Sequence, residues 1–386
     1  LTSKERMLKF DWNITDEHRA NLRYAKTEQN EPFYPGFSAT GVGLSSGFYN
    51  QGKSIETVVA QLFSDWTPNF STELRFSTRD YDSIPKNATA MPAISLQFQG
   101  ALPAGAPAGV PTGNRFLNFG TEYSRQNNVL RTDTKDFYAG ANWIVGDHEI
   151  KGGVDQTKNK VYNAFLQGVY GQYTFGCIAS TSATFYGFGA LPNCSTASQA
   201  TLEAAVLENF RRGRPTFYNV QTPVAGGSLN NAIAQFEVKN TGLFLQDTWT
   251  VSEDLTVTYG VRYDRNDVGG RPLANAAVAQ AVIAGNPATG VRQRGGFGYD
   301  NTRTIDGQDL IQPRVGFNYR FSNAPRPTQL RGGFGLFQGA AATVWMSNPF
   351  SNPGVATRFV SCSTTAAVNC PTTGGLFNID PNNQPN

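Results

Sequence analysis

Residues 255–264, which read LTVTYGVRYD, carry the pattern that decides the fold of this chain. One set of alternate positions is apolar or aromatic: Leu255, Val257, Tyr259, Val261 and Tyr263. The set between them is small or polar: Thr256, Thr258, Gly260, Arg262 and Asp264. Because successive side chains of an extended strand point to opposite faces, this period of two predicts a strand with one apolar and one polar face.

The same alternation occurs elsewhere in the chain. Residues 311–321 hold Ile311, Val315 and Phe317 in one phase and Arg314 in the other. Residues 8–14 and 20–24 alternate in the same way. The chain is therefore predicted to be all-β, built from several two-faced strands.

The connections between these segments fall into two kinds. Five are short and rich in turn-forming residues: 15–18, 67–70, 145–148, 251–254 and 322–327. The others are long and polar: about 31–54, 84–114, 165–235, 266–309 and 339 onward. A soluble sandwich would also alternate, but compact soluble domains rarely contain so many loops longer than ~15 residues. Short turns on one side and long loops on the other are typical of an antiparallel transmembrane β-barrel of the bacterial outer membrane. About ten strands are expected, paired as five hairpins.

Composition agrees with this fold class. Charged residues make up 16% of the chain, and 27 Phe and 15 Tyr are present. A net charge of +3 gives no reason to expect a nucleic-acid partner. No run of 18 apolar residues exists, which excludes a transmembrane helix but not a barrel, whose signal lies in alternation.

Aromatic residues gather near the short turns: Trp12, Trp66, Trp143, Trp249, Tyr319 and Phe321. They fit one interfacial girdle of a membrane barrel. The alternative is that they are ordinary sheet aromatics.

The four cysteines form two local pairs, Cys177 with Cys194 and Cys362 with Cys370, both in irregular stretches. Two disulfides that staple extracytoplasmic loops are expected. Zinc is the rival interpretation, but the chain has no CxxC.

Two other loop segments, 198–211 and 272–284, are predicted to be locally helical, with Ser198 or Thr201 capping the first.

No catalytic, metal or cofactor site is predicted. The only two histidines, His18 and His148, lie in short turns and are expected to be solvated. Asp264, Asn266 and Asp267 suggest a calcium loop, but the EF-hand spacing fails at Val268.

The polar strand faces carry the candidate lumen residues Arg23, Arg75, Arg262, Asp264, Arg314 and Arg331. One hypothesis is a mixed-sign network that the barrel uses structurally, and the other is a path for an anionic solute. Candidate ligand contacts in the loops are Tyr34, Phe37, Tyr49, Tyr170 and Tyr173, which could instead pack the loops together.

Several strings resemble one known family. FLQDTW at 244–249 with LTVTYGVRY at 255–263 resembles the barrel of TonB-dependent outer-membrane receptors. Other strings are similar to the Oar-like branch: QPRVGF at 312–317, LRGGFGLF at 330–337, VWMSNPFSNPGV at 344–355 and LKFDWNITDEHRANLRY at 8–24.

The resemblance implies a 22-stranded barrel with an N-terminal plug, energised through the TonB complex. No plug or TonB box is found, and the chain ends in a polar loop. Residues 1–386 are therefore expected to be an internal part of such a barrel, without its plug and C-terminus, surrounded by outer-membrane lipid. The expected function is capture of an unknown solute or peptide by extracellular loops and its passage through the barrel, without enzymatic activity. The alternative is a passive porin or a surface adhesin, and an outer-membrane enzyme is a weaker third.

Overall fold

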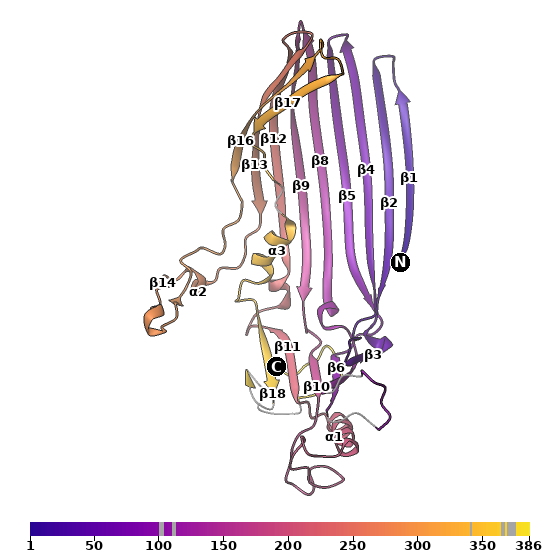
Figure 1. The fold of residues 1–386 in the computed structure, drawn as a ribbon, viewed down its shortest axis with the longest axis vertical. Helices are drawn as coiled ribbons and strands as arrows, with labels where there is room; N and C mark the ends of the chain where they lie inside the picture. Colours follow the sequence, from indigo (N-terminus) through magenta and orange to yellow (C-terminus); the bar gives the residue numbers. More distant parts are fainter. Residues whose placement is uncertain (100–103, 110–112, 340–341, 364–366, 369–375) are drawn as a thin grey trace.

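A ten-stranded antiparallel sheet dominates the computed structural model, which describes residues 1–99, 104–109, 113–339, 342–363, 367–368 and 376–386. Its strands are β1 (Thr2–Asn13), β2 (His18–Phe33), β4 (Tyr49–Thr67), β5 (Phe70–Asn87), β8 (Asn127–Val145), β9 (His148–Leu166), β12 (Ala234–Thr250), β13 (Leu255–Gly269), β16 (Asp309–Phe321) and β17 (Thr328–Gly335). Their order in the sheet is their order in the sequence (Figure 1). The predicted ten strands in five hairpins are confirmed, and the sheet is an open arc with β1 and β17 at its edges.

The five short turns lie where the sequence predicts them, all at one end of the sheet. In the β1–β2 turn, the hydroxyl of Thr15 accepts hydrogen bonds from the backbone N–H groups of Glu17 and His18. Ser252 does the same for Asp254 and Leu255 in the β12–β13 turn. These side-chain acceptors satisfy backbone donors that the tight turns leave unpaired.

The strands are longer than a membrane requires. β4, β8 and β9 have 19 residues each. At ~3.3 Å per residue they reach about 60 Å, whereas the apolar band of an outer-membrane barrel is about 25 Å tall. The strands therefore continue well beyond the bilayer on the side of the long connections.

Alternation gives the sheet one apolar and one polar face, as predicted. Directly paired residues share a face, so the row Trp12, Ala20, Leu62, Leu74, Ala139, Val154, Leu243, Tyr263 and Ile311 crosses nine strands on the outward face. The aromatic residues of the expected girdle are exposed near the turns, with Trp12 65% and Trp66 58% accessible. Such large exposed apolar surface is stable only when lipid covers it.

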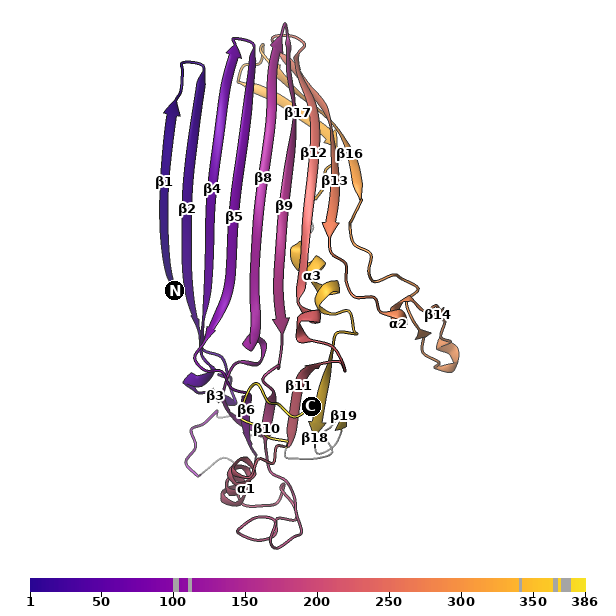
Figure 2. The same ribbon diagram turned by 180° about the vertical axis from the view of Figure 1, so that it is seen from behind.

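The long connections are far more ordered than the sequence suggests. They form a second sheet in the order β19-β18-β11-β10-β6-β7-β3 (Figure 2). Its strands are β3 (Gly41–Gly43), β6 (Ala93–Phe98), β7 (Arg115–Phe119), β10 (Gln172–Phe175), β11 (Phe217–Pro223), β18 (Thr357–Ser363) and β19 (Ala367–Val368). We call this second sheet the loop sheet.

The loop sheet has its own hydrophobic core. Tyr173, Phe175, Tyr218, Val220 and Val360 have 0–1% of their surface exposed. They come from two different connections, and Ile94 and Leu96 of a third connection join the same core, so burial of apolar surface ties these connections together. The long stretches that the sequence indicated only as polar loops therefore contain strands that pack together.

The described parts of the connections contain three α-helices. Helix α1 (Gln199–Arg211) agrees with the predicted segment 198–211, and Ser198 is its N-cap because its side chain accepts from the backbone N–H of Thr201. Helix α2 (Ala276–Ala279) is only four residues long, shorter than the predicted 272–284. Helix α3 (Thr343–Ser351), which the sequence did not predict, packs on the inner face of β9 and β12, where Phe350 stacks on Phe236 at 4.8 Å.

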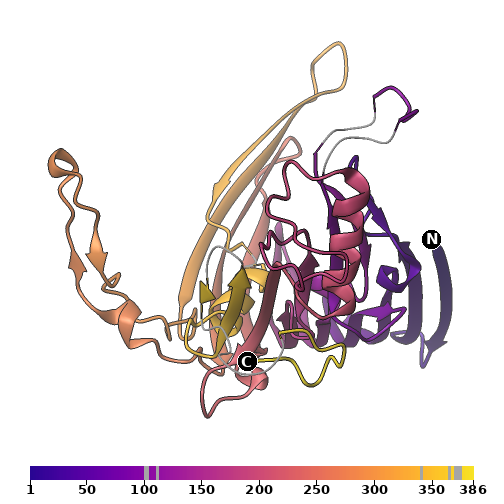
Figure 3. The same cartoon turned by 90° about the horizontal axis from the view of Figure 1, so that it is seen from below.

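The connection between β13 and β16 differs from the others in its position. Residues 270–308, with α2, β14 (Val282–Ile283) and β15 (Arg294–Gly295), form an arm that projects away from the sheet (Figure 3). In the same view the large sheet curves, with the loop sheet and α1 across its end. Among the described residues, no helix is long and apolar enough to cross a membrane.

Candidate binding cavity on the inner face

The inner face of the curved sheet holds a cavity of about 910 Å³. Residues of nine strands, all of the sheet except β1, line it. Strands that are far apart in the sheet order can line one cavity only where the sheet curves around it. The cavity therefore lies on the concave side of the sheet. We call this space the inner cavity.

The arginines predicted to face a lumen meet here. Arg23 on β2, Arg75 on β5, Arg262 on β13 and Arg314 on β16 all line the inner cavity, as does Arg79. Arg331 on β17 shares their face, because it pairs with Asn318, but it lies outside the cavity lining. Four of these arginines therefore line one cavity on the inner face, and their role in a lumen remains a prediction.

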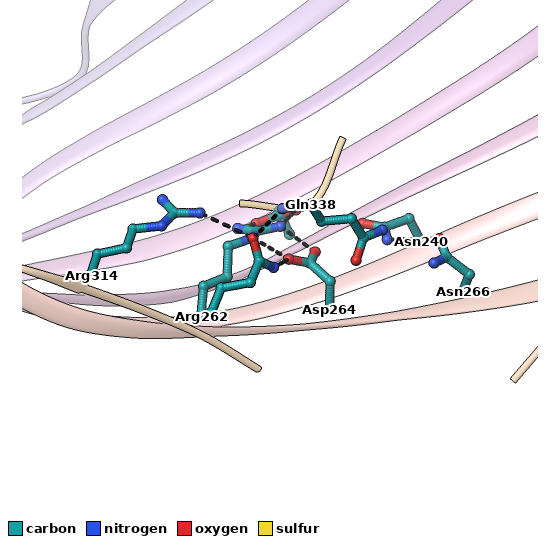
Figure 4. A network of polar contacts seen from close by, with 8 residues as sticks. Asn240, Arg262, Asp264, Asn266, Arg314 and Gln338 are labelled. Atoms are coloured by element: carbon teal, nitrogen blue, oxygen red, sulfur yellow. Dashed lines mark hydrogen bonds and ion pairs between the residues drawn. The ribbon is translucent and has the colours of Figure 1, made fainter. Parts of the chain in front are cut away.

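Arg262 is the centre of a polar network (Figure 4). Its Nη1 and Nη2 atoms donate to both oxygens of Asp155, at 2.6 and 2.9 Å. Its Nε and Nη2 atoms donate to Asp264, at 2.6 and 2.7 Å. Two carboxylates thus hold one guanidinium group from two sides, in bidentate geometry that also fixes its plane.

The network continues into β16. Asp264 is 3% exposed and Gln312 is 1% exposed, and the side-chain amide of Gln312 donates to the Asp264 carboxylate. The Gln312 carbonyl oxygen accepts from the backbone N–H of Gln338 at 2.7 Å and from Arg314 Nη2 at 3.3 Å. Buried polar groups are stable here because each has partners.

Gly242 makes space for this network. It lies on β12 between Asp155 and Asp264 in the strand pairing. A Cβ atom at this position would be 2.1 Å from Arg262 Nη2 and 2.9 Å from Asp264 Oδ1. A side chain at this position would therefore displace the guanidinium group from its present place, where it crosses β12 and reaches Asp155 on β9.

Sequence reasoning missed three members of the cavity, namely Tyr138, Asp136 and Asp155. Each lies on the inner phase of a strand, so extending the alternation rule through β8 and β9 would have placed them. The contact between Asp155 and Arg262 could not be predicted from the local sequence, because the two residues are 107 positions apart.

The loop aromatics divide into two groups. Tyr34 and Phe37 are 61% and 56% exposed and contact Phe48, at 5.0 and 6.1 Å between ring centroids. Tyr170 is partly buried, and its backbone N–H donates to Gln126 Oε1. These three remain accessible to a ligand.

Two of the expected ligand contacts are corrected. Tyr173 has no exposed surface, because it lies in the core of the loop sheet and donates to Gln384 Oε1 at 2.7 Å. Burial raises the pKa of Tyr173 to about 12 and also raises that of Tyr218. Tyr49 is 8% exposed and stacks on Phe33 at 5.0 Å. These rings pack the loops, which was the alternative interpretation.

The disulfide between Cys177 and Cys194 is present, with a Cα–Cα distance of 6.0 Å. It closes a short loop just before α1, within the connection between β9 and β12. The second expected pair involves Cys370, which lies outside the described residues.

The histidines have partners that the sequence did not reveal. His148 Nδ1 lies 2.7 Å from Asp247 Oδ2, and Tyr259 donates to the same oxygen at 2.6 Å. His148 also stacks on Trp249, and His18 contacts the Trp66 ring edge. This cluster lies on the outward face near the turns, away from the inner cavity. Among the residues that the structure describes, no group of His, Cys, Asp and Glu could hold a metal ion.

An open antiparallel arc with a lipid-type outward face, a charged inner face and long connections at one end defines the class of outer-membrane β-barrel domains. The comparison with protein families agrees, since residues 2–386 match the family described as "Outer membrane beta barrel domain". The chain belongs to this family, and its place is the bacterial outer membrane.

The comparison with solved structures finds outer-membrane transporters among those similar to this chain. The copper transporter OprC is 13% identical, with a TM-score of 0.43 over 86% of this chain and 37% of that chain. The transporter YddB from Escherichia coli is 11% identical, with a TM-score of 0.44 over 83% and 38%. The ferric-catecholate import receptor Fiu from E. coli K12 is 13% identical, with a TM-score of 0.40 over 82% and 41%. The chain thus spans about two fifths of each of these structures. No curated protein matches the sequence.

Proposed function

We propose that this chain is the barrel portion of a TonB-dependent receptor of the Oar-like branch. The extracellular loops capture a solute or peptide, and the TonB complex drives its passage along the inner face. The observation that carries the proposal is the arginine-lined inner cavity, which lies between the periplasmic turns and an ordered loop sheet. The family strings quoted above support the same assignment.

In this proposal, the complete barrel contains more strands than the ten that the structure describes. The edge strands β1 and β17 each pair on one side only in the described sheet. An open edge in hydrocarbon would leave backbone N–H and C=O groups without partners, so membrane strands occur in closed barrels. Residues 1–386 then form one arc of a barrel of about 22 strands, the number that the family resemblance implies.

The proposal assigns binding and passage but no catalysis. A candidate catalytic pair, His148 and Asp247, lies on the outward face, where lipid and not solute is the neighbour. A passive porin or a surface adhesin remains the second candidate, because both also use a barrel with long loops.

Two measurements on the intact protein separate these functions. Surface plasmon resonance with the purified periplasmic domain of TonB tests energy coupling, and planar-bilayer conductance tests for an open pore. Saturable TonB binding with no steady conductance is expected. Steady conductance without TonB binding would instead identify a porin, and the absence of both would favour an adhesin.

A further inference from the structure

The inner cavity contains more positive than negative charge. Its lining includes five arginines, Arg23, Arg75, Arg79, Arg262 and Arg314, but only two carboxylates, Asp136 and Asp155. Asp155 is bound by Arg262, which is further neutralised by Asp264. The remaining four arginines have no carboxylate within 4.0 Å among the described residues.

Asp136, the second carboxylate of the cavity, does not neutralise these four arginines. Asp136 accepts hydrogen bonds from the Ser77 hydroxyl at 3.1 Å and the Thr157 hydroxyl at 2.7 Å. These hydroxyl donors satisfy its oxygens locally. One carboxylate cannot neutralise four guanidinium groups, so the cavity retains an excess of positive charge that a bound anion would neutralise.

Two of the four guanidinium groups are held in place. Arg75 lies over the Tyr138 ring, 5.3 Å from its centroid, and Arg314 lies over the Phe337 ring at 4.4 Å. Gln312, itself fixed by buried Asp264, also binds Arg314. The Arg314 Nε atom is buried and has no hydrogen-bond partner. A buried donor without a partner is costly, and a carboxylate oxygen would satisfy it.

We propose that the inner cavity binds carboxylate-bearing anions through Arg23, Arg75, Arg79 and Arg314. This inference rests on the proposed function, in which a ligand travels along the inner face, and it names the chemical class of that ligand. The planar fork of each guanidinium group matches a carboxylate in bidentate geometry. The carboxylates can come from a small anionic solute or from acidic side chains of a protein segment inside the barrel.

The test uses the intact protein in detergent micelles and citrate as the probe. Isothermal titration compares the wild type with the double variant Arg75→Gln/Arg79→Gln. The matched control is Arg19→Gln/Arg320→Gln, which removes two charges from the same face but outside the cavity lining. If solutes occupy the site, citrate binds the wild type, the cavity variant raises the Kd at least tenfold, and the control changes it less than twofold.

If acidic side chains of the protein already occupy the site, citrate does not bind the wild type. The cavity variant then unfolds at a lower temperature than the control in low salt, and 1 M salt removes the difference. The proposal is overturned if citrate fails to bind and both variants unfold alike, or if both variants weaken citrate equally. Failure of TonB binding would reject the proposed function while leaving the citrate result unaffected.

Discussion

At the scale of single residues, Arg262 connects three strands of the sheet. It lies on β13, binds Asp155 across β12, and shares Asp264 with Gln312 on β16. Backbone ladders already join neighbouring strands, so this side-chain network adds stiffness across strands that are not neighbours. Asp264 and Gln312 are buried and Arg262 and Asp155 are partly buried, which makes the loss of one partner costly for the others.

Replacing Arg262 with Met is expected to destabilise the barrel by about 3 kcal/mol, because it leaves the carboxylates of Asp155 and buried Asp264 without their cation. The midpoint of denaturant unfolding, followed by tryptophan fluorescence, measures the effect. Arg320→Met is the control, since Arg320 is exposed on the same face and has no described ion pair. Equal midpoints for the two variants would show that the network is not stabilising.

Replacing Gly242 with Ala is expected to cost about 1–3 kcal/mol, because the new methyl group occupies the position of Arg262 Nη2. Gly316→Ala is the matched control on the same face, where the nearest atom to an added Cβ is 3.6 Å away. In the Arg262→Met background the cost of Gly242→Ala should nearly vanish. An additive double variant would contradict the steric explanation.

The sequence could predict which face these residues occupy but not which partners they have. Alternation places Arg262 and Asp264 on the inner face from local information alone. The contact with Asp155 depends on how β9, β12 and β13 pair, which no single strand determines. The same reason explains why His148 appeared isolated, because Asp247 lies 99 residues away.

At the scale of elements, the hairpins and the loop sheet differ in how the sequence encodes them. Each hairpin joins adjacent segments with a clear period of two, so its existence and turn follow from local patterns. The loop sheet joins strands of two to seven residues from distant connections, and includes the parallel pairs β6–β10 and β3–β7. Some of these strands alternate in burial, as β6 and β10 do, but stretches of only four to six residues carry too weak a local signal to be recognised as strands, so the sequence indicated only loops.

The Cys177–Cys194 disulfide should stabilise the part of the loop sheet that carries α1. It closes a loop with a sequence separation of 17, for which loop-closure entropy predicts about 3 kcal/mol. Cys177→Ser/Cys194→Ser is expected to make residues 177–216 sensitive to protease while the large sheet keeps its melting temperature. Mass mapping without reductant checks the bond itself, and free thiols in the wild type would contradict it.

The loop sheet should open at high pH. Burial raises the pKa of Tyr173 to about 12, so the packed phenol remains neutral where an exposed one would ionise. Its contribution to stability is complete below pH 10 and is lost as the pH rises from about 10 to 12, because only the opened loops release the proton. Near-ultraviolet circular dichroism should follow this transition.

Tyr173→Phe/Tyr218→Phe should shift that opening to higher pH, because the two phenols in the core of the loop sheet are then absent and cannot ionise. Tyr299→Phe is the control, since Tyr299 is 73% exposed on the projecting arm and should not change the transition. An unchanged transition in the double variant would show that other groups control the opening.

At the scale of the whole molecule, two faces and two ends define the protein. The outward face is apolar with an aromatic girdle near the turns, and the inner face carries arginines around one cavity. Short turns mark the periplasmic end, and the loop sheet marks the extracellular end. Alternation in the sequence was sufficient to predict this division, whereas the capped extracellular end required long-range pairing.

Spin labels placed one at a time at residues 257–263 of the intact protein in lipid bilayers would show which face of the sheet contacts lipid. Collision with oxygen, which concentrates in lipid, is expected to be greatest at Val257, Tyr259, Val261 and Tyr263. Collision with a water-soluble nickel complex should be greatest at Thr258, Gly260 and Arg262. Loss of the period of two, or the opposite phase, would contradict the assignment of lipid to the outward face and of the arginine face to the interior of an outer-membrane barrel.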